Sequence, residues 1–465
     1  MSRTLTTTEQ SPRRGAGAGG ALPRLRTYNP LGSALAFGRD PLRFLTALTR
    51  EHGDIVQFRL LHLPIVVLNH PDFIKRVLLD NHANYDKDNL IFRLLRPILG
   101  LGLVTNVGGE GWLRQRRLVQ PAFHRSRIAA MGRLMTEITD ARLQHWEAHA
   151  DRDEVLDVAE EMMLLTLQIV SRALFSLDMS DRASAFGGAF AETNRVLTTF
   201  ARFPFPPLTF PTPSHLRLWA ATRRMDTVAY ALIRERRERG EDTGDLLSML
   251  LLARDEETGE GMSDQQVRDE VMTALLAGHE TSSNALSWAW YLLSTHPEVE
   301  ARVHAELDTM LAGRVPGVED LPRLPYLHMV IEEALRLYPP TWQLMRRAIG
   351  EDEIGGYRIK AGTTLFWSQY LLHRHAAFWQ DPERFDPERF APDQVALRHR
   401  YAHMPFGTGP RMCIGASFAM TEILLILATI AQRYRLLLAS QQAVEPLATL
   451  ALRPRHGVPV RLARR

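Results

Sequence analysis

The sequence contains one cysteine, Cys413, in the glycine-rich stretch Phe406-Gly-Thr-Gly-Pro-Arg-Met-Cys-Ile-Gly415. A lone cysteine has no partner for an intrachain disulfide and no second sulfur for a zinc or iron–sulfur site. Because an apolar run from Ala416 to Ile430 follows, the stretch predicts a loop that leads into a helix. Unpaired amides and the dipole at a helix start favour a thiolate. The glycines and the nearby arginine indicate a metal-binding thiolate, although a buried structural cysteine is the commoner role.

A second set of chemically active residues lies in the stretch Ala277-Gly-His-Glu-Thr-Ser282. A serine and an aspartate at the start of the surrounding apolar segment predict a long helix over residues 263–294. Glycine in a helix costs about 1 kcal/mol relative to alanine, so Gly278 needs a reason. The hydroxyl of Thr281 can bond a carbonyl of its own helix and open a groove for a small molecule. Glu280 adds a group that can carry protons.

Two further spacings predict pairs of side chains on one helical face. Trp112 and Arg116 are four residues apart, and Glu333 and Arg336 are three residues apart. An indole N–H and a guanidinium can donate to one carboxylate. A buried glutamate–arginine pair is instead a scaffold element, because breaking it strongly destabilises a protein.

The cysteine stretch resembles the haem-binding signature of the cytochrome P-450 monooxygenases, Phe-x-x-Gly-x-Arg-x-Cys-x-Gly, at every fixed position. The resemblance implies haem b (iron protoporphyrin IX) as the cofactor, with Cys413 as the axial thiolate. A thiolate ligand favours O–O cleavage. Phe406, Arg411 and Gly415 would then lie at the haem, with Arg411 bound to a propionate.

The same resemblance assigns further haem ligands. Trp112 and Arg116 would bind one haem propionate. Arg346 or Arg347 would reach the second propionate, and we favour Arg346, although the sequence leaves this choice open.

The resemblance also assigns the proton path and the scaffold. Thr281 would hydrogen-bond bound dioxygen and Glu280 would supply protons. Glu333 and Arg336 match a Glu-x-x-Arg pair that an arginine from a later Pro-Glu-Arg-Phe sequence completes. That sequence occurs twice, and its distance from the cysteine loop leads us to choose Arg389.

The apolar segment over residues 85–107 would roof a substrate pocket in this family. The expected pocket residues are Phe92, Leu95, Ala277, Trp342 and Leu344. A proline-rich connector over residues 200–215 is either a lid over the substrate entrance or a loop that touches a membrane.

Composition indicates an ordinary globular chain, with 45% hydrophobic and 23% charged residues. The net charge of +3 is not gathered into patches, which argues against nucleic acid as a partner. Residues 1–28 predict a disordered tail and residues 29–465 a single domain. Without an apolar stretch of about 18 residues we expect no transmembrane anchor, and a single cysteine suits the cytoplasm.

The expected fold is mainly α with small β-sheets, the cytochrome P450 fold, with the haem between the long central helix and the helix after the cysteine loop. A helix over residues 41–52 and a hairpin over residues 55–68, with Pro64 at its turn, form a strand-rich corner.

The resemblance implies a monooxygenase that inserts one atom of O2 into an apolar substrate such as a terpenoid or a fatty acid. The sequence carries no flavin or nicotinamide fingerprint, so electrons must come from a separate ferredoxin and its NAD(P)H-dependent reductase. Arginines near residues 114–127 are interpreted as part of a docking surface for this partner. Two alternatives stay open: a peroxide-driven peroxygenase, which typically lacks the acid and the hydroxyl, and a non-catalytic haem-binding protein.

Overall fold

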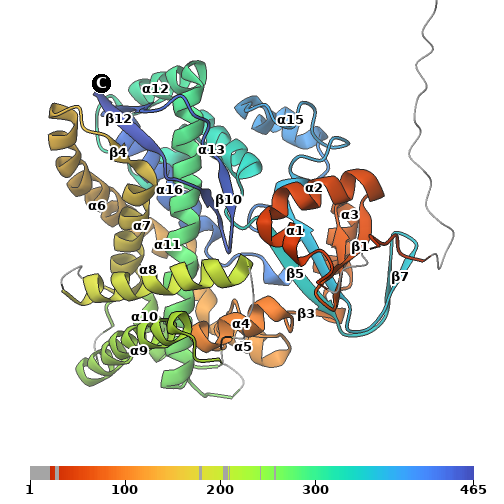
Figure 1. The fold of residues 1–465 in the computed structure, drawn as a ribbon. Coiled ribbons are helices and arrows are strands. Elements are labelled where there is room, and N and C mark those ends of the chain that lie inside the picture. Colours follow the sequence, from red (N-terminus) through yellow and green to blue (C-terminus); the bar gives the residue numbers. More distant parts are fainter. Residues whose placement is uncertain are drawn as a thin grey trace, which may run out of the picture.

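The computed structural model describes residues 21–26, 31–176, 181–202, 208, 210–240, 242–255 and 258–465. The chain folds into a helical body and a strand-rich corner beside it (Figure 1). The helices are α1 (Ala34–Arg39), α2 (Pro41–His52), α3 (Pro71–Lys75), α4 (Leu90–Leu99), α5 (Glu110–Val119), α6 (Arg125–Asp151), α7 (Val158–Phe175), α8 (Asp181–Arg202), α9 (Pro213–Arg239), α10 (Leu246–Leu252), α11 (Asp264–Thr295), α12 (Pro297–Leu311), α13 (Pro325–Leu337), α14 (Gln369–Leu372), α15 (Pro392–Leu397) and α16 (Ala416–Ala431). The strands are β1 (Ile55–Leu60), β2 (Leu63–Leu68), β3 (Tyr85–Asp86), β4 (Leu156–Asp157), β5 (Gln343–Ala348), β6 (Asp352–Ile354), β7 (Tyr357–Ile359), β8 (Thr364–Ser368), β9 (Tyr434–Leu438), β10 (Pro446–Ala448), β11 (Leu452–Pro454) and β12 (Pro459–Arg464).

Helix α11 runs through the middle of the molecule and packs against α7, α9, α13 and α16 (Figure 1). Ser263 caps it: the Ser263 hydroxyl accepts from the Gln266 amide at 3.2 Å, and the Gln266 side chain accepts from the Ser263 amide at 2.9 Å. This reciprocal cap satisfies two amides that a helix start leaves unpaired. The predicted helix over residues 263–294 is confirmed.

Gly278 has a packing reason within α11. A Cβ at this position would lie 3.1 Å from Val170 Cγ2 of α7, which is tighter than an ordinary carbon–carbon contact. The missing side chain therefore lets α7 and α11 approach each other closely.

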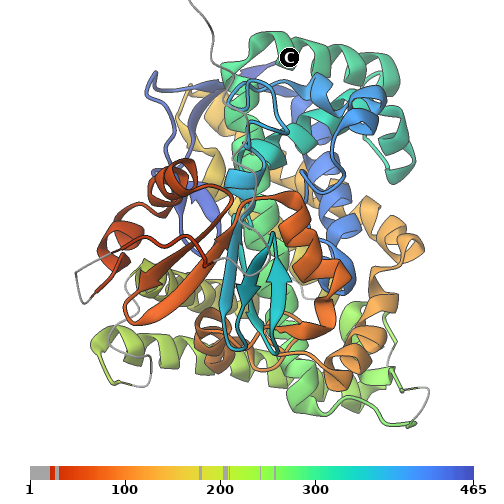
Figure 2. The same cartoon turned by 90° about the vertical axis from the view of Figure 1, so that its right-hand side faces the viewer.

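The strand-rich corner contains a sheet with the strand order β1-β2-β8-β5-β3, which faces the reader in Figure 2. Strands β1 and β2 form the predicted hairpin. Pro64, however, lies inside β2 opposite Arg59, and Leu61 and His62 make the turn. The prediction of Pro64 at the turn was therefore wrong. Leu61 has a φ of 56° there.

Two of the C-terminal strands, β9 and β11, pack against α11. Strands β4, β12 and β9 form one sheet, and β10 pairs with β11. The Trp288 indole N–H of α11 donates to the Leu452 carbonyl at 3.1 Å, so the β10–β11 hairpin is tied to the central helix.

The observed architecture is mainly helical with small sheets, as predicted, and helix α2 has the predicted bounds. Residues 21–26, which the sequence assigns to the tail, lie beside β1, where the Leu25 amide donates to the Gln57 carbonyl at 2.8 Å. The rest of the predicted tail, apart from these six residues, and much of the proline-rich connector (203–207 and 209) lie outside the described residues. In the part of the chain that the structure describes, no helix has the length and apolarity to cross a membrane.

Candidate functional site

The cysteine loop is a tight turn that glycines make possible. Gly407 and Gly409 have φ angles of 71° and 75°, a region that side chains with a Cβ rarely adopt. A Cβ at Gly409 would also lie 2.1 Å from the Leu78 carbonyl oxygen. The Cys413 amide donates to the Phe406 carbonyl at 3.0 Å, which closes the loop just before α16 begins.

Cys413 is exposed, yet burial raises the pKa of its thiol. Burial disfavours the charged thiolate, which is why it raises this pKa. The Gly415 amide and the charges of Arg116 and Lys87 act in the opposite direction. A metal ion bound to the sulfur would lower the pKa of the thiol and favour the thiolate.

Four cations surround the cysteine loop, and we call them the cation cluster: Lys87, Arg116, Arg346 and Arg411. Among the described residues, none of the four forms an ion pair with a carboxylate. Their side chains donate to backbone carbonyls instead: Lys87 to Val104 (3.0 Å), Arg116 to Met412 (3.1 Å), Arg346 to Met345 (2.8 Å), and Arg411 to Asn106 (3.2 Å) and Val107 (2.9 Å). The cluster therefore holds positive charge that the described protein does not neutralise.

The pKa values record this unpaired charge. Burial lowers the pKa of Arg346 to about 10. Burial, with repulsion from Arg346 and Arg116, lowers the pKa of Arg411 to about 9. The same causes hold the pKa of the Lys87 ammonium well below its ordinary value. An anion bound among these groups would reverse the shifts.

Trp112 adds an unpaired donor to the cation cluster. Its side chain is buried, and its indole N–H has no hydrogen-bond partner among the residues that the structure describes. The Arg411 guanidinium lies 3.6 Å from the centre of the Trp112 ring, and the Arg116 guanidinium 5.7 Å from it. A buried N–H without a partner is costly, so this one is suited to a bound acceptor.

Arg346 and Arg347 have different surroundings, although they are neighbours on β5. Arg347 forms ion pairs with Asp86 at 2.6 Å and with Asp88 at 2.9 Å. Arg346 is buried and has no carboxylate partner among the described residues. The geometry thus favours Arg346 over Arg347 as the anion ligand.

One face of α11 is accessible at the centre of the molecule. Ala274, Ala277, Gly278 and Thr281 follow the i, i+3, i+4, i+7 spacing of one helical face; Ala277 is exposed and the other three are partly so, while most of the helix is buried. The Thr281 hydroxyl donates to the Ala277 carbonyl at 2.8 Å, as its position in the sequence suggested, but α11 continues without a break.

Glu280 points toward α8. Asn194 Nδ2 donates to Glu280 Oε1 at 3.1 Å. Burial raises the pKa of Glu280, and the Asn194 amide and the charge of Arg453 partly oppose this shift. The neighbouring His279 is a buried core residue: its ring packs edge-on against Phe190 and burial lowers its pKa to about 4.

Glu333 and Arg336 form a buried network away from the cysteine loop. All five N–H bonds of Arg336 are used: two to Glu333 (2.6 and 2.8 Å) and one each to the carbonyls of His373 (2.8 Å), Pro382 (2.7 Å) and Arg384 (3.1 Å). Arg389 Nε lies 3.5 Å from Glu333 Oε1, whereas the Arg384 side chain is exposed. Arg389, and not the side chain of Arg384, therefore forms an ion pair with Glu333.

The expected pocket residues divide into two groups. Ala277 lies on the accessible face of α11, and Phe92 and Leu95 are buried on α4, where Lys87 Nζ lies 4.9 Å from the Phe92 ring centre. Trp342 instead lies in a core cluster, and its indole N–H donates to the Thr449 carbonyl at 2.9 Å. Leu344 is partly buried against the strand-rich corner.

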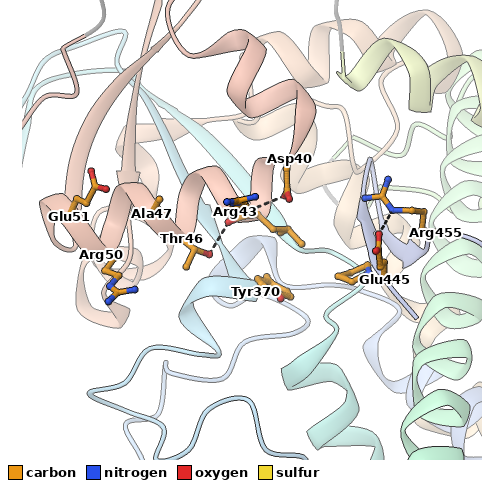
Figure 3. A pocket seen from close by; sticks show the side chains of 11 residues that line it. Asp40, Arg43, Thr46, Ala47, Arg50, Glu51, Tyr370, Glu445 and Arg455 are labelled. Carbon is orange, nitrogen blue, oxygen red and sulfur yellow. Dashed lines mark hydrogen bonds and ion pairs between the residues drawn. The ribbon is translucent and has the colours of Figure 1, made fainter. Parts of the chain in front are cut away.

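A pocket of about 780 Å³ lies between α2 and the β10–β11 hairpin (Figure 3). Its lining includes Asp40, Arg43, Arg50, Glu445 and Arg455 and none of the candidate site residues. Glu445 and Arg455 pair with each other at 3.0 Å. The pocket is open to solvent, and two of the charged residues that line it pair with each other. We therefore do not take this pocket as the candidate site.

Comparison with known proteins identifies the family. A sequence model of the family Cytochrome P450 matches residues 23–458. Cyclooctat-9-en-7-ol 5-monooxygenase of Streptomyces melanosporofaciens is 40% identical over 415 residues, 87% of this chain and 87% of that protein. Pentalenene oxygenase of Streptomyces avermitilis is 35% identical and covers 90% of this chain and 92% of that protein. The chain belongs to the cytochrome P450 family and is a monooxygenase.

The solved structures agree with this assignment. The crystal structure of the cytochrome P450DA heme domain matches with a TM-score of 0.86 and 29% identity, covering 97% of this chain and 99% of that chain. Members of the family use haem, a flat macrocycle with two propionate carboxylates. The cation cluster, the unpaired Trp112 N–H and the single thiol of Cys413 fit those donor and acceptor groups.

Sequence reasoning missed Lys87 and Asn194. Lys87 stands beside Asp86 in an ordinary polar stretch, and only its fold position brings it to the cysteine loop. Asn194 lies 86 residues before Glu280 on a separate helix. Of the arginines interpreted as a docking surface, Arg114 and Arg117 lie 3.5 and 3.6 Å from the buried Asp255 carboxylate.

Proposed function

We propose that Cys413 binds the iron of haem b and that the cation cluster binds the haem propionates. The observation that carries this proposal is the set of four buried or partly buried cations without a carboxylate among the described residues, gathered around the only cysteine. Buried charges need partners, and two propionates would supply them. Trp112 would donate its unpaired N–H to the same carboxylates.

The substrate is proposed to be a terpenoid or a similar lipid-like molecule. Cyclooctat-9-en-7-ol and pentalenene, which appear in the names of two relatives, are cyclic terpenoids. The apolar side chains of Phe92 and Leu95 and the accessible face of α11 at Ala277 suit such a molecule, since burial of apolar surface drives binding at roughly 25 cal/mol per Å². Trp342 is left out of the proposed pocket because its indole is satisfied in the core.

Bound haem supplies the activation of dioxygen and the insertion of one oxygen atom. In this proposal Thr281 holds its hydroxyl on the accessible face of α11 and passes a proton toward the space beside Cys413. Glu280 is the proton source behind it, kept in place by Asn194. Burial raises the pKa of Glu280, which favours the protonated form that a proton source needs. Both residues are those that a peroxygenase typically lacks, which supports the monooxygenase.

Electrons are proposed to come from a separate ferredoxin and an NAD(P)H-dependent ferredoxin reductase in the cytoplasm. The support is the sequence, which contains no flavin or nicotinamide fingerprint and no cysteine set for an iron–sulfur cluster. Arg125 and Arg127, both exposed at the start of α6, would contribute positive charge to the docking of an acidic partner.

The proposal is tested by the spectrum of the reduced protein with carbon monoxide. The parent should show the red-shifted absorption of thiolate ligation, and Cys413→Ser should lose it. Met412→Leu, which changes the exposed neighbour of the ligand, serves as the control and should keep the parent spectrum. A serine variant with the parent spectrum would exclude Cys413 as the ligand.

A further inference from the structure

Residues 100–108, which we call the wall segment, connect α4 to α5 beside α11. Two adjacent carboxylates of α11 accept hydrogen bonds from the first part of the wall segment. The Leu101 amide donates to Asp269 Oδ2 at 2.8 Å, and the Leu103 amide donates to Glu270 Oε2 at 3.3 Å. Both carboxylates are buried, so these hydrogen bonds are shielded from competing water.

The wall segment is pressed against α11. A Cβ at Gly100 would lie 2.0 Å from Asp269 Oδ1, and a Cβ at Gly102 would lie 2.1 Å from Thr273 Oγ1. No side chain with a Cβ fits at such distances. Thr273 directly precedes Ala274, where the accessible face of α11 begins, so the wall segment borders that face.

A chain of hydrogen bonds crosses the wall segment from α11 to the cysteine loop. Gln115 Nε2 donates to Glu270 Oε1 and, at 3.0 Å, to the Leu101 carbonyl. Asn106 Nδ2 donates to Gln115 Oε1 at 2.9 Å, and the Asn106 carbonyl accepts from Arg411 at 3.2 Å. Gln115 thus uses its amide nitrogen and its amide oxygen to join α11, the wall segment and, through Asn106, the cation cluster.

We propose that Glu270 and Gln115 are positioning residues that hold the wall segment as one wall of the substrate site and couple it to the anion bound by the cation cluster. The inference rests on the proposed function, because it takes that anion to be the haem propionates. A buried polar chain in which each member has its partner fixes one arrangement, and losing one member leaves the others unpaired. The choice of substrate that fits against the wall segment would then depend on Glu270 and Gln115, although neither residue contacts the substrate.

The test uses the haem-loaded protein and two azoles that bind haem iron. The phenyl ring of 4-phenylimidazole needs space beside the iron, whereas imidazole alone does not. Gln115→Leu keeps the side-chain size but removes three hydrogen bonds. We expect it to weaken 4-phenylimidazole binding about tenfold, the size expected for one buried hydrogen bond, and to leave imidazole binding unchanged. Gln394→Leu, which loses only an exposed hydrogen bond to Asp393 on α15, should leave both affinities unchanged.

A pH series separates positioning from a general packing role. Burial raises the pKa of Glu270 to about 8, and its ionisable neighbour Asp269, which pairs with Arg268 at 3.0 Å, adds to the shift. Gln115 from α5 and the Leu103 amide from the wall segment oppose it. As pH rises through about 8, Glu270 ionises, and its carboxylate accepts the hydrogen bonds from the Leu103 amide and from Gln115 more strongly, which holds the wall segment more tightly. Parent affinity for 4-phenylimidazole relative to imidazole should rise over this range, and Glu270→Gln should remove the rise.

The outcomes are distinguishable from failure of the proposed function. Loss of the thiolate spectrum in the parent contradicts the proposed function itself. A normal parent spectrum, with Gln115→Leu and Glu270→Gln both matching the parent in the affinity ratio of the two azoles and in its pH dependence, overturns the positioning role alone. Equal weakening of both azoles by Gln115→Leu also overturns it, because that result would place the damage at the iron rather than at the wall.

Discussion

The cation cluster and the Glu333–Arg336 network are both buried sets of charged groups, but they solve the problem of burial differently. Arg336 uses all five of its N–H bonds within the protein, and Glu333 takes two of them. The cation cluster has four positive side chains and, among the described residues, no carboxylate paired with any of them. The charges of the Glu333–Arg336 network are balanced within the protein. The positive charges of the cation cluster would be balanced by a bound anion.

The difference teaches where to look for a bound group. A buried charge costs several kcal/mol unless it is paired. A self-satisfied network therefore indicates scaffold, and buried charges of one sign indicate a binding site. Asp86 shows the contrast locally, since it pairs with Arg347, while the adjacent Arg346 has no carboxylate partner in the described part of the chain.

The largest effect is expected from breaking the self-satisfied network. Arg336→Leu would leave the fully buried Glu333 carboxylate without its cation, a change that costs about 3–5 kcal/mol. The free energy of unfolding, measured by urea denaturation without added haem, should fall by that amount. Arg389→Leu should cost much less, because Arg389 reaches Glu333 only at 3.5 Å. Equal losses in both variants would contradict the ranking.

A polar residue that faces the site but belongs to neither region should affect chemistry alone. Thr281→Ala should keep haem binding and stability, because among the described residues the Thr281 hydroxyl bonds only a carbonyl of its own helix. Removing a positioned proton donor costs a factor of about 10² to 10⁴ in the step it serves. Product per NAD(P)H consumed should fall and peroxide should rise, measured with a surrogate ferredoxin system.

Thr281→Ser is the matched control, because it keeps the hydroxyl. It should remain close to the parent in coupling. An alanine variant as well coupled as the parent would remove Thr281 from the proton path and leave it a helix-backbone role.

Glu270 shows a third way to bury a charge, which is to neutralise it by protonation. Its pKa is raised by burial to about 8 in the folded state, against about 4.3 in an unfolded chain. The folded state thus binds the proton more tightly, so its contribution to stability is present below about pH 4.3 and is lost as pH rises to about 8. Between pH 6 and 8 the parent should lose about 1–3 kcal/mol relative to Glu270→Gln, measured by urea denaturation at each pH. Parallel pH curves would contradict a buried, protonated Glu270.

The smallest effect is expected from a change in the cation cluster. Arg346→Met should lower haem affinity about tenfold, because one charged contact to a propionate is lost. The haem-free protein should be as stable as the parent or more stable, since a buried cation is removed. Haem titration and urea denaturation of the haem-free protein measure both quantities. Arg347→Met, whose cation is paired with Asp86, should leave haem affinity unchanged; the reverse pattern would assign the propionate to Arg347.

The parts of the fold and of the site that could be predicted are those set by residues close together in the sequence. The cysteine loop, the cap and length of α11, and the Glu333–Arg336 pair all depend on residues close together in sequence, where glycine, capping and i, i+3 rules apply. The third network member, Arg389, followed from the resemblance and its position. Function followed because the cysteine signature is long.

The remaining errors and omissions come from tertiary placement. Pro64 fits a turn by composition but lies in β2, where its missing N–H is tolerated opposite Arg59. Trp342 stands near the expected pocket in sequence, yet its indole turns to the Thr449 carbonyl in the core. Asn194 belongs to a helix that meets Glu280 only in the folded chain. No local pattern marks such contacts.

The bond from Arg411 to the Asn106 carbonyl joins residues 305 positions apart. At about 5–20 residues per second, a ribosome needs roughly 15 to 60 s to make the chain between them. During that time α4, α5 and the carbonyls of the wall segment exist without the cysteine loop. In the proposed function, haem loading therefore comes at the end of synthesis, and the early N-terminal part also waits for β5 and β8, which complete its sheet only later in the chain.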